Sequence, residues 1–424
     1  MRASRTLAAG ILSSVTAVAT LLTGVATAPP AEARRWTAAW VAATQPAMPG
    51  YETPNWSVDG FAEQSVRQVI RVSVGGSSLQ VRLTNRYGTG PLRLAGATIG
   101  RSTGGAAVAP HTLRHLTFGG RTTLTIPAGR EAVSDATVLR TRPLDKLTLT
   151  LYFAAPTGPA TFHEGAYATT YRAAGDHRFD TGAKAFDETT RSWYFLAGVD
   201  ITGSRGSVVM FGDSLTDGHG STPDADNRYP DEVAERLVRA HRRLGVVNAG
   251  VNGNHLLNDV PCFSGDSGVT RFERDVLDQP GVHTTVVLMG TNDIGVGGID
   301  IGCANPPVAT AAALIGGYRK MIQAARERDV RIVGATIPPM KGAYVYDTPE
   351  HEAVRDAVNE WIRTSGAFDA VADLDAALAD PADPDALRPA YDSGDHLHPN
   401  DAGAAAMARA VAPHLLGGNH QRAS

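Results

Sequence analysis

Four short polar segments in the second half of the chain hold the residue types that acyl transfer requires. Gly212-Asp213-Ser214 follows an apolar run and places a serine at a tight turn. Residues 248–254 (NAGVNGN) form a loop rich in backbone donors, residues 290–293 read GTND, and residues 395–400 read DHLHPN. Acyl transfer needs a nucleophile, a base, a group that orients the base, and donors for the oxyanion.

Each of these requirements has a candidate residue. Ser214 is the predicted nucleophile, provided that a base accepts its proton. His398 is the predicted base, and Asp395, three residues earlier, is expected to orient its imidazole. The amides of Ser214 and Gly253 and the side-chain amide of Asn292 are expected to form the oxyanion hole.

Other polar residues near these segments have less direct roles. Asp213 is expected to fix the turn by hydrogen bonds rather than to take part in the chemistry. His219, His255 and His396 are expected at the rim or against substrate, and not as a second base. Asn254 is expected to hold the loop that carries the second oxyanion donor.

The elements that must position these residues alternate between strand and helix. We predict strands at 207–211, 246–247, 285–289, 331–337 and 370–374, and helices from 230 and at 309–328, 350–364 and 401–415. The alternation predicts a parallel sheet covered by helices on both faces, in a compact flavodoxin-like α/β arrangement over residues 207–416. The polar segments would then meet at the carboxyl edge of the sheet, where such folds bind ligands.

The first half of the chain has a different periodicity. Between residues 36 and 201, apolar and polar residues alternate in short runs that Gly-rich turns separate. This pattern predicts an antiparallel β-sandwich as an accessory domain, followed by a short linker at 203–206. Four of the five tryptophans lie in this half, and a core position is favoured for them over stacking on sugars.

Length and charge limit the possible functions. A chain of 424 residues predicts two domains, and a formal net charge of −4 without a basic run gives no electrostatic case for binding nucleic acid. Two cysteines, Cys262 and Cys303, cannot form a zinc site by themselves, so we expect no metal. We predict instead that they form a disulfide between the two long loops that follow Gly253 and Asn292.

The N-terminus has the pattern of an export signal. Arg2 and Arg5 precede an apolar run at 7–25, and the small-residue site Ala31-Glu32-Ala33 follows. Residues 1–33 are therefore expected to be a signal peptide that is removed, which makes the protein secreted and extracellular, with no stable membrane anchor. We expect a monomer.

The four polar segments, in this order, resemble the sequence blocks of the GDSL or SGNH hydrolases, a family of esterases and lipases. GDSLTDG would contain the nucleophile Ser214, NAGVNGN the oxyanion donor Gly253, GTND the donor Asn292, and DHLH the pair Asp395 and His398. The resemblance implies a serine hydrolase that needs no cofactor. The first half is loosely similar to the β-rich extension of some secreted bacterial members grouped with carbohydrate esterases.

Three functions are compatible with these observations. The first is a secreted serine ester hydrolase that cleaves short acyl (acetyl) esters, with a small molecule or polysaccharide as substrate. The second is a lipase or phospholipase acting on longer acyl chains. The third, of another class, is a carbohydrate-binding protein with an inert hydrolase domain, and the intact set of five site residues argues against it.

Overall fold

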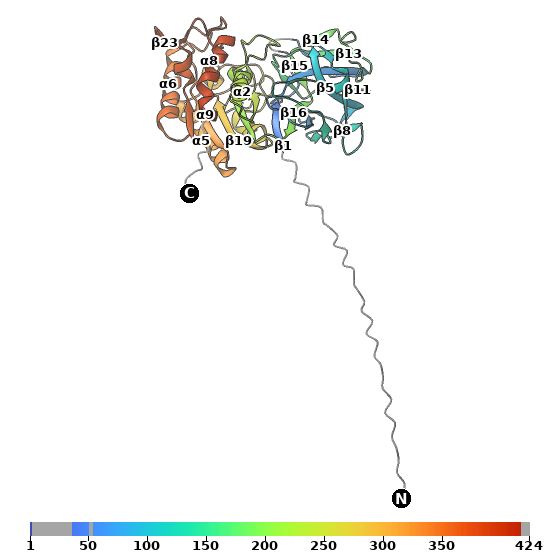
Figure 1. The fold of residues 1–424 in the computed structure, drawn as a ribbon. Coiled ribbons are helices and arrows are strands. Elements are labelled where there is room, and N and C mark those ends of the chain that lie inside the picture. The colour runs from blue at the N-terminus through green and yellow to red at the C-terminus, as the bar shows by residue number, and fades with distance from the viewer. Residues whose placement is uncertain (2–35, 51–53, 417–424) are drawn as a thin grey trace. The chain divides into compact units, whose positions relative to one another are not determined.

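The computed structural model describes residues 36–50 and 54–416, together with Met1 (Figure 1). The expected signal peptide at 1–33 lies outside the described residues, apart from Met1. Among the helices of the described ranges, none has both the length and the apolar character that crossing a membrane requires.

A five-stranded parallel sheet forms the centre of the second half. Its strands are β17 (Ser207–Gly212), β18 (Gly245–Gly250), β19 (Val282–Leu288), β20 (Arg331–Ala335) and β21 (Ala370–Ala372). They pair in the order β18-β17-β19-β20-β21, which is the 2-1-3-4-5 order of flavodoxin-like sheets. The predicted parallel sheet is therefore present, and its strands end at one common edge.

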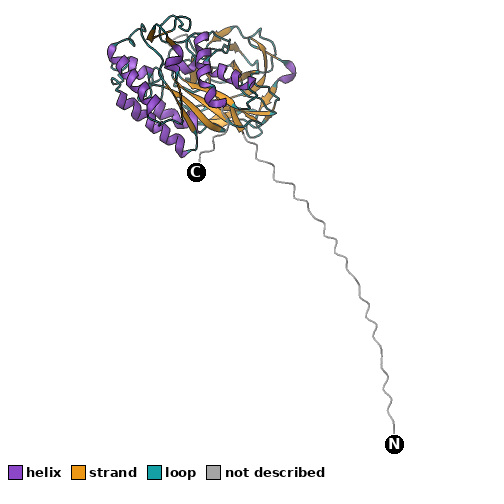
Figure 2. Ribbon diagram, turned by 60° about the vertical axis from the view of Figure 1, so that its left-hand side comes forward, coloured by secondary structure: helices purple, strands orange, loops and turns teal. Residues whose placement is uncertain are grey.

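Alternate side chains of β17 enter two different apolar cores. Val209 and Phe211 pack in one core with residues of helices on one face, whereas Val208 and Met210 pack in another. Figure 2 shows the helices beside the strands of this sheet. The longer helices that contribute to the first core are α5 (Ala311–Glu327) and α6 (Pro349–Thr364), with the short α3 (Gly268–Phe272) beside them. Those that contribute to the second core include α2 (Tyr229–Arg239), α7 (Leu374–Leu378) and α8 (Asp401–Val411).

Two helix predictions differ from the structure. The predicted helix at 401–415 is divided into α8 and α9 (Pro413–Leu416), because Pro413 has no N–H to continue the helical hydrogen bonds. The helix predicted from 230 is present as α2, but an unpredicted helix precedes it: α1 (Ser214–Asp217) is a single turn, too short to give a periodic pattern. The remaining short elements of this half are a π-helix (Glu273–Leu277), α4 (Thr291–Gly295), β22 (Ala379–Asp380) and β23 (Asp383–Leu387).

The first half is antiparallel and β-rich, as predicted. One sheet has the order β1-β16-β3-β10, with β9 also paired to β3, and the other has the order β14-β13-β2-β11-β5-β6, with β7 paired to β5. Both sheets contribute to one apolar core, for example Val81 and Val199 from the first and Val66 and Leu149 from the second. The strands of this half are β1 (Trp36–Val41), β2 (Gln64–Arg71), β3 (Ser78–Thr84), β4 (Leu92–Leu94), β5 (Gly96–Gly104), β6 (Ala107–Val108), β7 (Arg114–Leu116), β8 (Leu124–Ile126), β9 (Glu131–Val133), β10 (Thr137–Val138), β11 (Lys146–Phe153), β12 (Phe162–Glu164), β13 (Thr170–Ala174), β14 (Glu188–Thr190), β15 (Ser192–Tyr194) and β16 (Leu196–Thr202).

Strand β1 belongs to the cores of both halves. Ala39 and Trp40 pack in the β-rich core, whereas Ala38 and Val41 pack in a core of the α/β half. Trp40 meets Trp193 edge to face, with ring centroids 4.7 Å apart, and both rings are buried. The core position predicted for the tryptophans is thus confirmed for these two, while the boundaries at 36–201 and 207–416 stay predictions.

Candidate active site

The turn after β17 places Ser214 at the start of α1. Gly212 fits there because a Cβ would lie 2.0 Å from the Thr216 hydroxyl oxygen and 2.6 Å from the Leu288 carbonyl oxygen. The carboxylate of Asp213 caps α1 by accepting a hydrogen bond of 3.1 Å from the Leu215 amide. Asp213 therefore fixes the turn in the way that the sequence predicts.

Ser214 is the first member of a hydrogen-bonded line of three side chains. Its Oγ lies 2.8 Å from Nε2 of His398, and Nδ1 of His398 lies 2.6 Å from Oδ2 of Asp395. The other oxygen of Asp395 accepts hydrogen bonds from the amides of His398 and Leu397, at 2.8 and 3.0 Å. Because a carboxylate accepts from Nδ1–H, the neutral imidazole presents an unprotonated Nε2 to the serine hydroxyl.

The local electrostatics keep Asp395 ionised. Partial burial by itself would raise the pKa of Asp395, but the hydrogen bond and charge of His398, with the two backbone amides, hold that pKa well below its usual range. The carboxylate therefore remains charged at every pH at which the histidine titrates. It can orient the imidazole throughout that range.

This charge state predicts a single acidic limb in the pH profile of esterase activity. Activity should rise as His398 loses its proton, within the histidine range of about pH 5–8. Asp395 should add no second limb there, since its lowered pKa means that it gains a proton only in stronger acid. Measuring kcat/KM against pH tests this, and a flat profile across that range would argue against a histidine base.

The two predicted oxyanion residues Gly253 and Asn292 follow β18 and β19, Gly253 in a loop and Asn292 in the first turn of α4. Gly253 has a φ of 68°, and a Cβ there would lie 2.1 Å from the ring of Phe263, so only glycine fits. The side-chain amide of Asn292 donates to the carbonyl of Asn254 at 3.0 Å. Tyr346 donates its hydroxyl to Oδ1 of Asn292 at 2.9 Å, which fixes the orientation of the amide. Since Nδ2 carries two hydrogens, the second can serve an acyl oxygen.

A buried arginine that the sequence analysis missed braces these strand ends. Arg271 donates to the carbonyls of Gly212 and Ala249, at 2.7 and 2.8 Å, and to Oδ1 of Asn254 at 2.9 Å. Its guanidinium also lies over the ring of Phe211, 4.1 Å from the centroid. Arg271 therefore connects the strands that lead to Ser214 and Gly253, and Asn254 holds the loop as predicted.

Two buried carboxylates lie beneath the site. Asp293 accepts hydrogen bonds from the amides of Leu256 and Leu257, at 2.6 and 3.0 Å, and so joins the two oxyanion loops. Burial raises the pKa of Asp293 to about 6 and that of Asp213 to about 7, the latter with a further contribution from the charge of Asp293. Both groups stabilise loops and neither contacts His398 by a hydrogen bond in the described structure.

A buried histidine of the β-rich half contacts α1, the helix that begins at Ser214. Nδ1 of His163 lies 2.7 Å from the carbonyl of Ala43, and Nε2 lies 3.1 Å from Oδ1 of Asp217. A carbonyl can only accept, so Nδ1 donates the hydrogen bond to Ala43. Asp217 is the last residue of α1, the helix that Ser214 begins. The ring of His163 also stacks on Trp193, with centroids 5.4 Å apart.

Removing this histidine should destabilise the protein strongly. His163→Ala should lower the free energy of unfolding by roughly 3–5 kcal/mol, because it deprives a buried carboxylate of one partner. His177→Ala is the matched control, since His177 pairs with Asp180 at the surface and should cost at most about 1 kcal/mol. Urea unfolding of both variants tests this. Equal, small losses would mean that the His163–Asp217 contact contributes little.

The other three histidines have different environments. His219 is half-buried beside His398, with ring centroids 4.1 Å apart, which agrees with a rim position. His396 is exposed and pairs with Asp392 at 2.7 Å. The rim prediction for His255 is wrong: its side chain is fully buried, and burial lowers its pKa to about 4, so it is neutral.

One group of side chains near the site has the spacing of metal ligands. The ligand atoms of His219, Asp395 and His398 all lie within 4.8 Å of one another. The two ring nitrogens of His398 already face Asp395 and Ser214. A metal ion bound to Nε2 of His398 would therefore compete with the serine hydroxyl.

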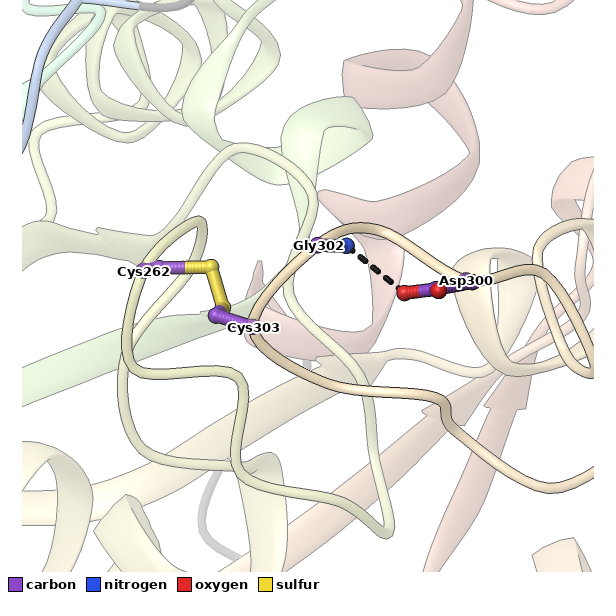
Figure 3. Close-up of a disulfide and its surroundings, with 4 residues drawn as sticks. All are labelled: Cys262, Asp300, Gly302 and Cys303. Atoms are coloured by element: carbon purple, nitrogen blue, oxygen red, sulfur yellow. Dashed lines mark hydrogen bonds between the residues drawn. A yellow bond between two sulfur atoms is a disulfide. The ribbon is translucent and has the colours of Figure 1, made fainter.

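The predicted disulfide is present. Cys262 and Cys303 are bonded, with Cα atoms 6.0 Å apart and a sequence separation of 41 residues (Figure 3). The turn that carries Cys303 is closed by a hydrogen bond of 2.8 Å from the Gly302 amide to Asp300. Phe263, the neighbour of Cys262, is the residue whose ring lies against Gly253. The disulfide thus connects the loop that follows β18 to the loop that follows α4, close to Gly253.

Loss of this disulfide should lower stability and turnover together. Closing a loop of this length stabilises by roughly 3–4 kcal/mol on the chain-entropy model. Cys262→Ser/Cys303→Ser should therefore melt several degrees lower than the wild-type protein, and should turn over ester more slowly. Calorimetry and kinetics of the variant, with the reduced wild-type protein beside it, test this. Unchanged melting would contradict the stabilising role.

The sequence of the second half defines the protein class. Residues 210–406 match the GDSL-like Lipase/Acylhydrolase family, and this range includes all five predicted site residues of the hydrolase blocks. The chain therefore contains a GDSL-like acylhydrolase domain, and the protein is a carboxylic ester hydrolase. A search among curated proteins gives no match.

Several solved structures are similar to about half of the chain. An acetylxylan esterase from Geobacillus stearothermophilus is 21% identical, with a TM-score of 0.39, and the match covers 51% of this chain and 96% of that one. A lipase/acylhydrolase from Enterococcus faecalis is 20% identical, with a TM-score of 0.38 and coverage of 50% and 95%. A GDSL-like lipase from Bacteroides thetaiotaomicron is 16% identical, with a TM-score of 0.35 and coverage of 50% and 87%.

Proposed function

We propose that the protein is a secreted serine esterase that cleaves short acyl esters, acetyl esters above all, on carbohydrate. The observation that carries the proposal is the continuous line of hydrogen bonds from Ser214 through His398 to Asp395. Ser214 attacks the acyl carbon while Nε2 of His398 takes its proton, and the same histidine then protonates the leaving alcohol. A water molecule, activated by His398, releases the acid and restores Ser214.

The oxyanion forms on the carbonyl oxygen of the ester during both steps. The amides of Ser214 and Gly253 and the side chain of Asn292 stabilise its charge, which needs donors at fixed positions. The hydrogen bond from Tyr346 to Asn292 and the bracing contacts of Arg271 support such fixed positions. No cofactor takes part in this scheme.

The size of the acyl group is proposed from the rings next to the oxyanion residues. Phe263 lies against Gly253, and Tyr346 lies against both Asn292 and Gly295, where a Cβ would be 1.9 Å from its ring. Bulky rings on both sides favour an acetyl or similarly short acyl group over a long chain. A lipase or phospholipase remains the alternative.

Secretion and the role of the first half belong to the same proposal. A disulfide persists in oxidising compartments, which supports export through the expected signal peptide at 1–33. The shared core of the two antiparallel sheets supports a β-sandwich accessory domain over residues 36–201. We propose that the enzyme acts outside the cell as a monomer.

An acetate-release assay on acetylated xylan, run beside p-nitrophenyl esters of increasing chain length, tests the substrate class. We expect acetate release and a fall in kcat/KM as the acyl chain grows. A maximum at long chains would favour the lipase alternative. Binding to xylan with no turnover of any ester would favour the inert carbohydrate-binding alternative.

A further inference from the structure

A cavity far from Ser214 is lined by five arginines. It has a volume of ≈ 970 Å³, and the lining side chains include Arg101, Arg140, Arg142, Arg242 and Arg243. Its lining residues include no aspartate and no glutamate. A cluster of positive charge of this density is unusual in a chain whose formal net charge is −4.

The cavity lies at the opposite edge of the parallel sheet from the esterase site. Its lining residues at 202–203, 238 and 241–243 precede the first residues of β17 and β18, whereas Ser214 follows the last residue of β17. Six residues of β17 separate the two edges, which is roughly 17 Å at 3.3 Å per residue. A ligand in this cavity is therefore not the acyl group in the esterase site.

Ordinary structural roles account for only part of the arginine cluster. Arg101 is held by Asp145 at 3.5 Å and by the carbonyl of Arg140, and Arg243 donates to the carbonyl of Gly203. Basic residues just after a helix also balance its C-terminal dipole, which suits Arg242 and Arg243 after α2.

Neither the helix dipole nor these contacts account for Arg140 and Arg142, which lie in the loop between β10 and β11 in the β-rich half. Both are exposed, and within the described residues the side chains of Arg140, Arg142 and Arg242 form no salt bridge or hydrogen bond. Three guanidinium groups at one cavity are thus available to a ligand.

The chemistry of the lining indicates the kind of ligand. A guanidinium group pairs with a carboxylate through two parallel hydrogen bonds, so each arginine can bind one carboxylate strongly. Hydroxyl groups of Ser77 and Thr202 also line the cavity and can bond sugar hydroxyls, whereas those of Ser73 and Thr141 are buried and already form hydrogen bonds to backbone groups. The lining has no phenylalanine, tyrosine or tryptophan, and its one ring is the imidazole of His241, which gives little surface for stacking nucleic-acid bases or neutral sugars.

We propose that this cavity is a second binding site, and that it takes an oligosaccharide bearing carboxylate groups. The volume lies at the upper end of the range of ligand sites, which accommodates several sugar units. The arginines hold the carboxylates, and the hydroxyl side chains hold the sugar ring. The site goes beyond the esterase function and does not depend on it.

Calorimetric titration of the full protein with unesterified oligogalacturonate tests the proposal, since this probe has carboxylates and no ester to be cleaved. We expect binding that weakens as salt is raised, and no binding of neutral xylo-oligosaccharides. Arg140→Glu/Arg142→Glu should weaken binding by about tenfold or more, because two charge-assisted contacts are replaced by repulsion. Its Tm shows whether the variant is folded.

Arg93→Glu/Arg130→Glu is the matched control, with the same change of charge on exposed arginines of the β-rich half that do not line the cavity. It should bind oligogalacturonate like the wild-type protein. Absence of binding by the wild-type protein, equal loss in both variants, or tighter binding of duplex DNA than of oligogalacturonate would each overturn the proposal. None of these outcomes depends on whether Ser214 is a nucleophile.

Discussion

Replacing Ser214 with alanine is expected to abolish esterase turnover while the protein remains folded. Loss of a serine nucleophile lowers kcat by about a millionfold in well-studied serine hydrolases. Ser214 Oγ makes its hydrogen bond to His398, at the mouth of a turn that Gly212 and Asp213 hold independently. Little folding energy should therefore be lost. Steady-state kinetics with p-nitrophenyl acetate and a melting curve measure the two effects separately.

Ser221→Ala is the control for this variant. Ser221 is also buried and follows α1 in the same segment, but it does not contact His398 by a hydrogen bond in the described structure. Its turnover should stay close to that of the wild-type protein, because the substitution removes no group of the hydrogen-bonded line from Ser214 to Asp395. Covalent labelling by a fluorophosphonate should add one adduct to the wild-type protein and none to Ser214→Ala. Near-normal turnover by Ser214→Ala would show that another group is the nucleophile.

Local periodicity explains which parts of the fold were predictable. Helix α5 was expected at 309–328 and spans Ala311–Glu327, because a long amphipathic helix repeats its pattern over several turns. The strands of the parallel sheet are short buried runs between turn residues, and they too were found. Helix α1 was missed because one turn of helix has no period. Its position depends on the cap at Asp213 and on packing.

The five predicted site residues were recognisable because each follows a strand or precedes a helix in a polar loop. A parallel sheet brings such loops to one edge, so their order in the sequence was enough to group them. The supporting residues carry no such signal. Arg271 is 59 residues from Gly212, and Tyr346 is 54 residues from Asn292. His163 is likewise 54 residues from Asp217. Only the folded chain brings each pair together.

The basic cavity illustrates the same limit for charge. The sequence has no basic run, and its formal net charge is −4. The arginines of the cavity come from β5, from the loop after β10 and from the turn after α2. Folding concentrates positive charge that the linear sequence distributes. Net charge therefore excludes a uniformly basic surface, but it does not exclude a local anion site.

The second large effect is expected at the oxyanion hole. Asn292→Ala should lower kcat about a hundred- to a thousandfold with little change in KM, since one oxyanion donor contributes about 2.7–4 kcal/mol in the transition state. The substitution also removes the hydrogen bond from Nδ2 to the carbonyl of Asn254. A deficit that lay wholly in KM would show that Asn292 binds the ground state of the substrate instead.

Tyr346→Phe separates the donor from its orientation. The variant keeps Asn292 but removes the hydroxyl that donates to its Oδ1 at 2.9 Å, so the amide should lose part of its alignment. A hydrogen bond of this kind contributes about 0.5–1.5 kcal/mol, which predicts a fall in kcat of roughly two- to tenfold. Tyr344→Phe is the control, because Tyr344 is 89% exposed in the same loop and should change nothing. If both variants had wild-type kcat, the amide of Asn292 would be oriented by its contact with Asn254 alone.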